Sequence, residues 1–270
     1  MFRSIAFGGG GMRGALHLGG LRAVLEFQDK LVFPDGIYGY SIGSIIATAL
    51  AFNLELHQIQ QMIDESMHLE SVMQNPKLTM FTDLFDKCGL LSMDQVERSI
   101  VHAFLKQGVD LRGKTIEDAP QKLFIGASNL TLRRPVFFTG KIPILTAIKA
   151  SCCIPCFFQP QVIYNNVYVD GGVYMYYFDE YLPKDCLSFI VSYTPKGLRP
   201  QDLSIVELVK QLYCGQRRPP TSKYAIWFKE DRVHVIHDIK EEDKKRLIQQ
   251  GYLQVLSFLT QRVAEEGHQV

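Results

Sequence analysis

Three short stretches of this 270-residue chain combine residue types that can carry out acyl transfer. The first is Gly39-Tyr-Ser-Ile-Gly43, a G-x-S-x-G pattern between a β-like run and a helix-like run. A serine on such a sharp strand-to-helix turn is lifted clear of the sheet, and the flanking glycines leave room for neighbouring backbone. The helix that follows points free N–H groups and the positive end of its dipole at the same place. Ser41 is therefore a candidate nucleophile.

The second stretch is a glycine-rich turn, Gly8–Gly14, between the first predicted strand and a helix-like segment that begins at Ala15. The N–H groups of such a turn, together with the start of the helix, form an anion site. A tetrahedral intermediate at Ser41 carries negative charge on the former carbonyl oxygen, and backbone donors aimed at that oxygen stabilise it. The pattern thus favours an oxyanion hole, in which Arg13 either braces the turn or meets a phosphate.

The same turn has a competing interpretation, because Gly9-x-Gly11-x-x-Gly14 matches the dinucleotide-binding fingerprint. That fingerprint also needs an acidic residue at the end of the second strand. Here the second strand ends at Ser41, and Asp35 lies at its other end. We therefore expect no nicotinamide or flavin. A turn that only packs a helix against a strand is the remaining alternative.

The third stretch is Val169-Asp170-Gly171-Gly172. Taken alone, an aspartate before two glycines is usually a turn residue. A serine hydroxyl, however, is a poor nucleophile without a base within hydrogen-bonding reach. A carboxylate can be that base if partial burial raises its pKa, and small glycines beside it let a substrate approach.

Composition narrows the class of protein. The chain is 47% hydrophobic and 21% charged, with a net charge of +1, and this near balance argues against a nucleic-acid-binding protein. Six cysteines without a disulfide-framework spacing favour a reducing, intracellular and cytoplasmic setting. No apolar run reaches the length of a membrane span, so we expect any membrane contact to be peripheral. The oligomeric state stays open.

Periodicity predicts one α/β domain over residues 1–270, without repeats or a separating linker. The hairpin is expected to turn at Asn165-Asn166, where positive φ is tolerated. Strands are predicted at 2–7, 36–40, 121–130, 135–139, 162–164, 167–169, 187–194 and 232–239. Helices are predicted at 15–26, 42–52, 55–68, 92–106, 143–150, 204–214 and 241–265.

Taken in this order, the three motifs and the small-residue segment Ala150-Ser-Cys-Cys-Ile-Pro155 closely resemble patatin-like phospholipases. The resemblance extends from Ile5 to about Thr194 and implies a three-layer fold, with a mostly parallel central sheet flanked by helices. A motif-bearing core (5–194) would then be followed by a helical extension (204–265). The implied enzyme hydrolyses acyl esters of membrane lipids, as a phospholipase A or lysophospholipase, without a metal or other cofactor. By position, the resemblance implies a Ser41–Asp170 dyad, an oxyanion hole at Gly10, Gly11 and Arg13, and supporting glycines at 9, 14, 39, 43, 171 and 172.

Two departures from this interpretation remain open. The family often continues the aspartate turn with asparagines and a proline, whereas this chain has Val173-Tyr-Met-Tyr-Tyr-Phe178, which leaves the bracing of Asp170 in question and allows a lipid-binding protein with weak catalysis. A Ser-His-Asp hydrolase with His234 or His237 as base is less favoured, because only one strand–helix unit precedes Ser41.

Cys153-Ile-Pro-Cys156 is better explained by packing than by redox chemistry. We expect the aromatic segments Phe157–Phe158 and Tyr174–Phe178 either to dock on a bilayer or to pack in the core.

Overall fold

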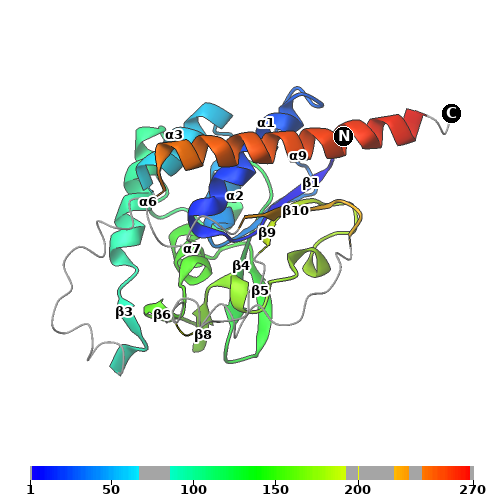
Figure 1. The fold of residues 1–270 in the computed structure, drawn as a ribbon. Helices are drawn as coiled ribbons and strands as arrows, with labels where there is room; N and C mark the ends of the chain where they lie inside the picture. Colours follow the sequence, from blue (N-terminus) through cyan, green and yellow to red (C-terminus); the bar gives the residue numbers. More distant parts are fainter. Residues whose placement is uncertain (1, 67–85, 193–199, 201–221, 231–238, 268–270) are drawn as a thin grey trace.

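The computed structural model describes residues 2–66, 86–192, 200, 222–230 and 239–267 (Figure 1). Its strands are β1 (Ser4–Phe7), β2 (Gly36–Tyr40), β3 (Gly89–Leu91), β4 (Leu123–Asn129), β5 (Arg134–Phe138), β6 (Cys156–Phe158), β7 (Gln161–Ile163), β8 (Asn166–Val169), β9 (Leu187–Ser192) and β10 (Ala225–Lys229). Its α-helices are α1 (Ala15–Leu25), α2 (Ile42–Ala51), α3 (Leu56–Ser66), α6 (Asp94–Lys106), α7 (Ile144–Cys152) and α9 (Glu241–Gly267). Short 3₁₀ helices include η1 (Gly11–Gly14), η3 (Gly171–Val173) and η4 (Phe178–Tyr181).

The central sheet has the order β10-β9-β1-β2-β4-β8-β7, and β5 also pairs with β4. The five strands from β10 to β4 are parallel, whereas β5 and β8 run antiparallel to β4. The predicted fold class, a mostly parallel sheet flanked by helices, is therefore confirmed. A separate two-stranded parallel sheet pairs β3 with β6.

One edge of β4 is shared by two strands that approach each other end to end. Residues 125–129 of β4 pair with β5 along one edge. On the opposite edge, β2 pairs with the first half of β4 as far as Gly126, and β8 pairs with Ser128 and Asn129. Because β2 and β8 run in opposite directions, their carboxyl ends point towards each other. β2 ends opposite Gly126 and β8 ends opposite Ser128, so only Ala127 of β4 lies between them. The residues that follow these ends are Ser41 and Asp170.

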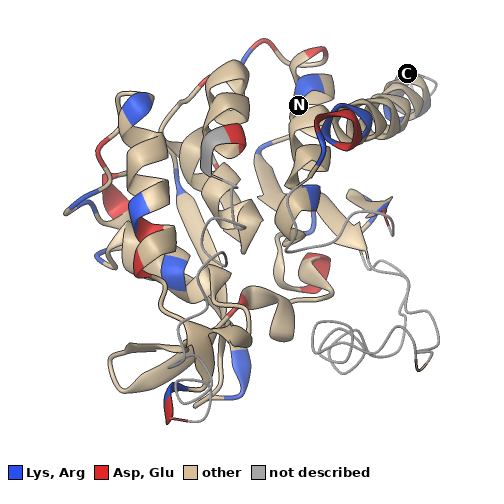
Figure 2. Cartoon of the chain, turned by 60° about the vertical axis from the view of Figure 1, so that its left-hand side comes forward, with Lys and Arg blue, Asp and Glu red and all other residues tan. Residues whose placement is uncertain are grey.

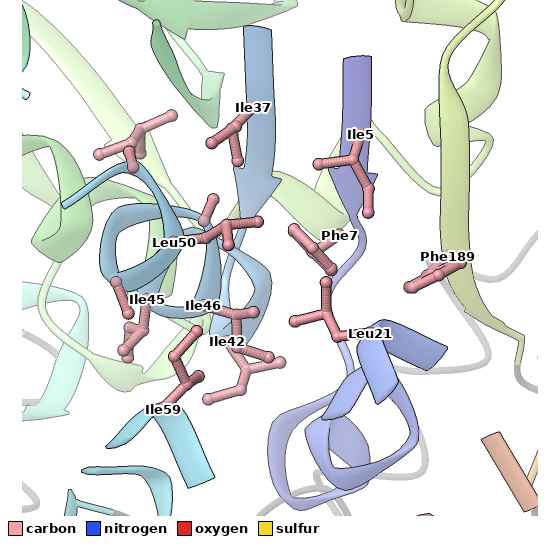
Figure 3. Packing of buried hydrophobic residues seen from close by; sticks show 14 of the residues in the cluster. Ile5, Phe7, Leu21, Ile37, Ile42, Ile45, Ile46, Leu50, Ile59 and Phe189 are labelled. Atoms are coloured by element: carbon pink, nitrogen blue, oxygen red, sulfur yellow. The ribbon is translucent and has the colours of Figure 1, made fainter. Parts of the chain in front are cut away.

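Apolar side chains between the sheet and its helices form the main core. Ile5, Phe7, Ile37 and Phe189 project from the strands towards α1, α2 and α3 (Figure 3). A smaller core on the other face of the sheet contains Tyr40 and is closed by the segment leading into η4. Charged residues lie mainly on outer helices and loops, whereas α2 has none (Figure 2). This distribution is expected for a helix that is buried all round.

Several local predictions differ from the structure. The β7–β8 hairpin turns at Tyr164 and Asn165, whose φ angles are 47° and 60°, one residue earlier than predicted. β10 was not predicted, although its apolar run Ala-Ile-Trp-Phe is a strand signal. The short strands β3 and β6 were also missed. The helix predicted at 204–214 and the strand predicted at 232–239 lie outside the described residues, apart from Ile239.

The C-terminal helix α9 packs along α1 through glycines (Figure 1). A Cβ atom on Gly251 of α9 would overlap the carbonyl oxygen of Leu16, and one on Gly19 of α1 would overlap that of Ile248. The two backbones therefore lie closer together than any side chain would allow.

We expect Gly251→Ala to destabilise the protein by roughly 1–3 kcal/mol, because the overlap opposes the better helix propensity of alanine. Urea unfolding measures the loss. Ser257→Ala, at an exposed position of the same helix, is the matched control and should be neutral or slightly stabilising. Equal stability of the two variants would contradict the close approach of α1 and α9.

Candidate active site

Ser41 occupies a strained turn. It lies between β2 and α2 with φ 54° and ψ −133°, a conformation that L-residues rarely adopt and that costs about 1–3 kcal/mol. Both motif glycines are needed for backbone packing: a Cβ on Gly43 would overlap the carbonyl oxygen of Phe7, and one on Gly39 would overlap that of Gly43. The start of α2 can therefore press against the end of β1 and hold the serine at the sheet edge.

Hydrogen bonds from two further serines hold this strained turn. The N–H of Ser41 donates to the hydroxyl oxygen of Ser151 at 2.8 Å, and that hydroxyl donates to the carbonyl of Gly126 at 2.6 Å. The Ser44 hydroxyl donates to the Ser41 carbonyl at 2.7 Å. No motif in the sequence marks Ser44 or Ser151 for these roles. The only sequence signal for Ser151 is its place in the small-residue segment that carries the family resemblance.

The glycine-rich turn lies directly against the serine. A Cβ on Gly9 would be 3.1 Å from the Cβ of Ser41 and 2.5 Å from the ring of Tyr40. Gly11 has φ 54°, which favours glycine, and no hydrogen bond ties the N–H groups of Gly10 or Gly11 to a described residue. These donors are therefore free for an oxyanion beside Ser41.

Arg13 braces this turn. Its side chain is buried, and Nε donates to the carbonyl of Gly10 at 3.2 Å. Nη1 donates to the carbonyl of Glu230 at 3.0 Å. The arginine thus joins the turn to the end of β10. Of the two roles considered from sequence, bracing is the one that these contacts support.

His17 is a second support for the turn, and it carried no motif in the sequence. Its Nε2 donates to the carbonyl of Gly8 at 2.9 Å, and its ring is surrounded by Phe7, Phe189 and Phe228. Complete burial lowers the pKa of His17 to about 4, against a smaller raising effect of the hydrogen bond to Gly8. The ring is therefore neutral at physiological pH and holds the turn without adding a charge.

Asp170 follows β8 and faces the serine from the opposite strand end. Its Oδ1 accepts the N–H of Gly172 at 2.8 Å, whereas Oδ2 is buried without a hydrogen-bond partner among the described residues. Burial raises the pKa of Asp170 to about 6, against the lowering effects of the Ser41 hydroxyl and the Gly172 N–H. A buried carboxylate oxygen with no partner, beside a serine hydroxyl, is suited to accept a proton.

The turn that carries Asp170 is well braced despite its unusual sequence. The Ser128 hydroxyl donates to the carbonyl of Gly171 at 3.1 Å and accepts the N–H of Tyr174 at 3.0 Å. The N–H of Asp170 donates to the carbonyl of Cys153 at 2.8 Å. A Cβ on Gly171 would lie 2.7 Å from the Cβ of Tyr40, so the turn rests on the residue before the nucleophile.

The aromatic segments near Asp170 contribute mainly to the core. Phe158, Met175 and Phe178 are buried, so of the two roles considered for these segments, core packing is the one that the structure supports for these three residues. Tyr176 and Tyr177 are half-buried and contact the ring of Trp227. The family often has asparagines and a proline after this turn. In this chain the residues at these positions include Met175 and Phe178, which pack in the smaller core and hold the turn.

The remaining candidates give no second site. His234 and His237 lie outside the described residues. Cys153 is a buried free thiol, consistent with a packing role.

Within the described ranges, no group of three or more histidine, cysteine or acidic side chains is placed to hold a metal. In the same residues, no helix is long and apolar enough to cross a membrane.

Comparison with known proteins shows the family of this chain. A model of the patatin-like phospholipase family matches residues 5–177, which include all three motifs. The chain belongs to this family. Among curated relatives, the probable lipid hydrolase 463L of Invertebrate iridescent virus 6 is 26% identical, over 64% of this chain and 60% of its own length. The cUMP-AMP-activated phospholipase of Escherichia coli is also 26% identical, over 63% of this chain and 54% of its own length.

The chain spans less than two thirds of the length of the curated relatives that it matches. The crystal structure of VipD from Legionella pneumophila aligns with 96% of this chain and 67% of its own, with a TM-score of 0.58 and 14% identity. At that identity the likeness establishes the patatin-like fold alone.

We expect Ser151→Ala to lower turnover by about 10- to 100-fold, because a displaced catalytic group loses rate steeply. The variant leaves the N–H of Ser41 and the carbonyl of Gly126 unpaired in a buried place. The rate of covalent labelling by a fluorophosphonate reports the position of Ser41 directly. Thr48→Val is the matched control, since it removes another buried hydroxyl of the same neighbourhood that does not touch Ser41. Equal labelling rates in the two variants would rule out this positioning role.

Asp170→Asn should stabilise the fold at neutral pH. The pKa of Asp170 is raised, so its ionisation costs folding free energy that is absent below about pH 4 and complete above about pH 6. A shift of about two units makes the gain at pH 8 about 3 kcal/mol larger than at pH 4.

Unfolding of this variant in urea at several pH values measures the gain. Asp110→Asn is a control of opposite sign, because hydrogen bonds from Arg112 lower the pKa of Asp110 to about 2. That variant should lose stability at neutral pH. A gain for Asp170→Asn that does not vary with pH would contradict the buried charge.

Proposed function

We propose that this protein is a lipid acyl hydrolase that uses Ser41 and Asp170 as a catalytic dyad. The observation that carries the proposal is the end-to-end approach of β2 and β8 along one edge of β4. At this junction the serine lies beside the carboxylate, and the N–H groups of Gly10 and Gly11 in the adjoining turn donate to no described residue. A nucleophile, a base and oxyanion donors at one point are what acyl transfer requires.

In the proposed reaction, Oγ of Ser41 attacks the ester carbonyl while Oδ2 of Asp170 accepts the hydroxyl proton. The N–H groups of Gly10 and Gly11 stabilise the oxyanion of the tetrahedral intermediate. The intermediate collapses to an acyl-serine, and the departing alcohol takes the proton from Asp170. Water, deprotonated by the same carboxylate, then attacks the acyl-serine, which releases the fatty acid and regenerates Ser41.

The pKa of the base fits this cycle. At about 6 it leaves Asp170 mostly ionised at neutral pH, yet more basic than an ordinary aspartate. The same group can return its proton to a leaving alcohol. No cofactor takes part in these steps.

Family membership and the names of the relatives favour a phospholipid as substrate. We propose that cleavage is of the phospholipase A or lysophospholipase type. We propose further that the protein works inside the cell in peripheral contact with a membrane. The cysteines that the structure describes are all free thiols, as expected in a reducing compartment.

Release of fatty acid from defined phospholipid vesicles tests the function. Ser41→Ala and Asp170→Asn should each reduce turnover by at least about 100-fold, and the double variant should be scarcely worse, because the two residues act as a unit. For the parent, kcat/KM should fall as pH drops through about 6, since the base must be ionised.

Variants of His234 and His237 test the alternative Ser-His-Asp mechanism. His234→Ala and His237→Ala should retain activity on the same substrate. An inactive histidine variant beside an active Asp170→Asn variant would disprove the dyad. A parent protein that binds vesicles without releasing fatty acid or reacting with a fluorophosphonate would be a lipid-binding member of the family.

A further inference from the structure

Two hairpin tips, residues 130–133 between β4 and β5 and residues 164–165 between β7 and β8, project beyond the edge of the sheet where Ser41 lies. β4 runs parallel to β2, and Gly126 pairs with Tyr40. The strand continues for three more residues to Asn129, which at about 3.3 Å per residue places its turn roughly 10 Å beyond the level of Tyr40. The β7–β8 turn lies beside it, because β8 pairs with the end of β4. Figure 1 shows β4, β5 and β8 on the side of the molecule away from α9.

These two tips are joined into one unit. The N–H of Leu130 donates to the carbonyl of Val167 at 2.8 Å, and the N–H of Val167 donates to the Thr131 hydroxyl at 2.9 Å. The side chain of Asn129 accepts the N–H of Leu132 at 2.8 Å and donates to Asn166 at 3.2 Å. The tips are therefore a preformed surface.

Exposed apolar side chains gather on this unit. Tyr164 is 78% exposed and Val162 is 70% exposed, the highest values among large apolar residues that the structure describes. Leu132 is 51% exposed and Leu130 is 38% exposed. Their accumulation on two adjacent tips marks an interaction surface, whereas single exposed leucines need no explanation.

The charged side chains of these two hairpins are all positive. Arg133 and Arg134 are exposed at the β4–β5 tip. The whole segment from residue 119 to 169, which includes both hairpins, contains no aspartate or glutamate. A surface of leucine, valine and tyrosine flanked by arginine matches the boundary between anionic head groups and acyl chains.

We propose that the paired tips of the β4–β5 and β7–β8 hairpins dock this protein on an anionic lipid bilayer. This inference rests on the proposed function and deepens it by naming the surface on which the enzyme meets its substrate. The apolar side chains enter the interface, and the arginines contact lipid phosphates. Both tips lie beyond the carboxyl end of β2, which Ser41 follows, so docking brings this edge of the sheet to the bilayer.

Vesicle co-sedimentation in a Ser41→Ala background tests the surface while the lipids stay intact. Phosphatidylcholine vesicles are compared with vesicles that also contain phosphatidylglycerol. Leu132→Ser, Val162→Thr, Tyr164→Asn in combination removes the apolar contacts, and asparagine tolerates the positive φ at position 164. Its matched control is Leu253→Ser, Val263→Ser, at positions 53% and 58% exposed on α9.

We expect the triple variant to bind both kinds of vesicle at least about tenfold more weakly, whereas the α9 control binds as the parent does. Arg133→Asn, Arg134→Gln should weaken binding to anionic vesicles by about thirtyfold at low salt, and less as salt rises. Lys122→Gln, Lys141→Gln is the charge-matched control, since both lysines belong to the same acid-free segment at the other end of the β4–β5 pair.

Unchanged binding of either tip variant, or an equal loss in its control, would overturn the proposal. A parent protein that binds neither kind of vesicle would also overturn it, and the tips would then be a surface for binding another protein. Thermal unfolding of each variant excludes a loss of fold. Hydrolysis of a water-soluble ester by the same tip variants with Ser41 restored should be unchanged, so failure to dock and failure of the proposed chemistry are told apart.

Discussion

The active site depends on the sharing of one strand edge. β4 offers a single edge to β2 and β8, and neither strand can extend past the other without losing its hydrogen bonds to β4. The backbone ladder therefore sets the separation of Ser41 and Asp170, since each residue follows the last residue of its strand. Strand ends held by a central sheet fix side chains more firmly than a loop would, which is what a two-residue catalytic unit needs.

Around this junction, polar side chains hold backbone that has no regular partner. Ser151 and Ser44 secure the strained turn at Ser41, and Ser128 secures the turn after Asp170. His17 and Arg13 fix the glycine-rich turn through its carbonyl groups, and the N–H groups of Gly10 and Gly11 donate to no described residue. Each of these bonds contributes about 1 kcal/mol, so the two that Ser41 makes with Ser151 and Ser44 are comparable in size to the strain at Ser41.

The buried carboxylate shows why such a site is costly to fold. Asp170 loses hydration on burial, and the Ser41 hydroxyl and the Gly172 N–H offset this loss only in part, so its charged form is destabilised. The same loss makes it a better base towards Ser41. Stability and activity are therefore opposed at this residue, and the apolar anchor formed by Met175 and Phe178 helps to hold the turn in place.

The sequence alone determined the three motifs, their order, the family and most of the helices, because glycine patterns and apolar periodicity are local properties. It could not determine which side chains support the site. Ser41 and Ser151 are 110 residues apart, and neither His17 nor Ser128 has a local motif. Burial of Met175 and Phe178 and the inclusion of β10 in the sheet likewise depended on long-range packing. Only the tertiary structure shows that β2 and β8 meet on β4, because strand pairing is set by hydrogen bonds between distant segments.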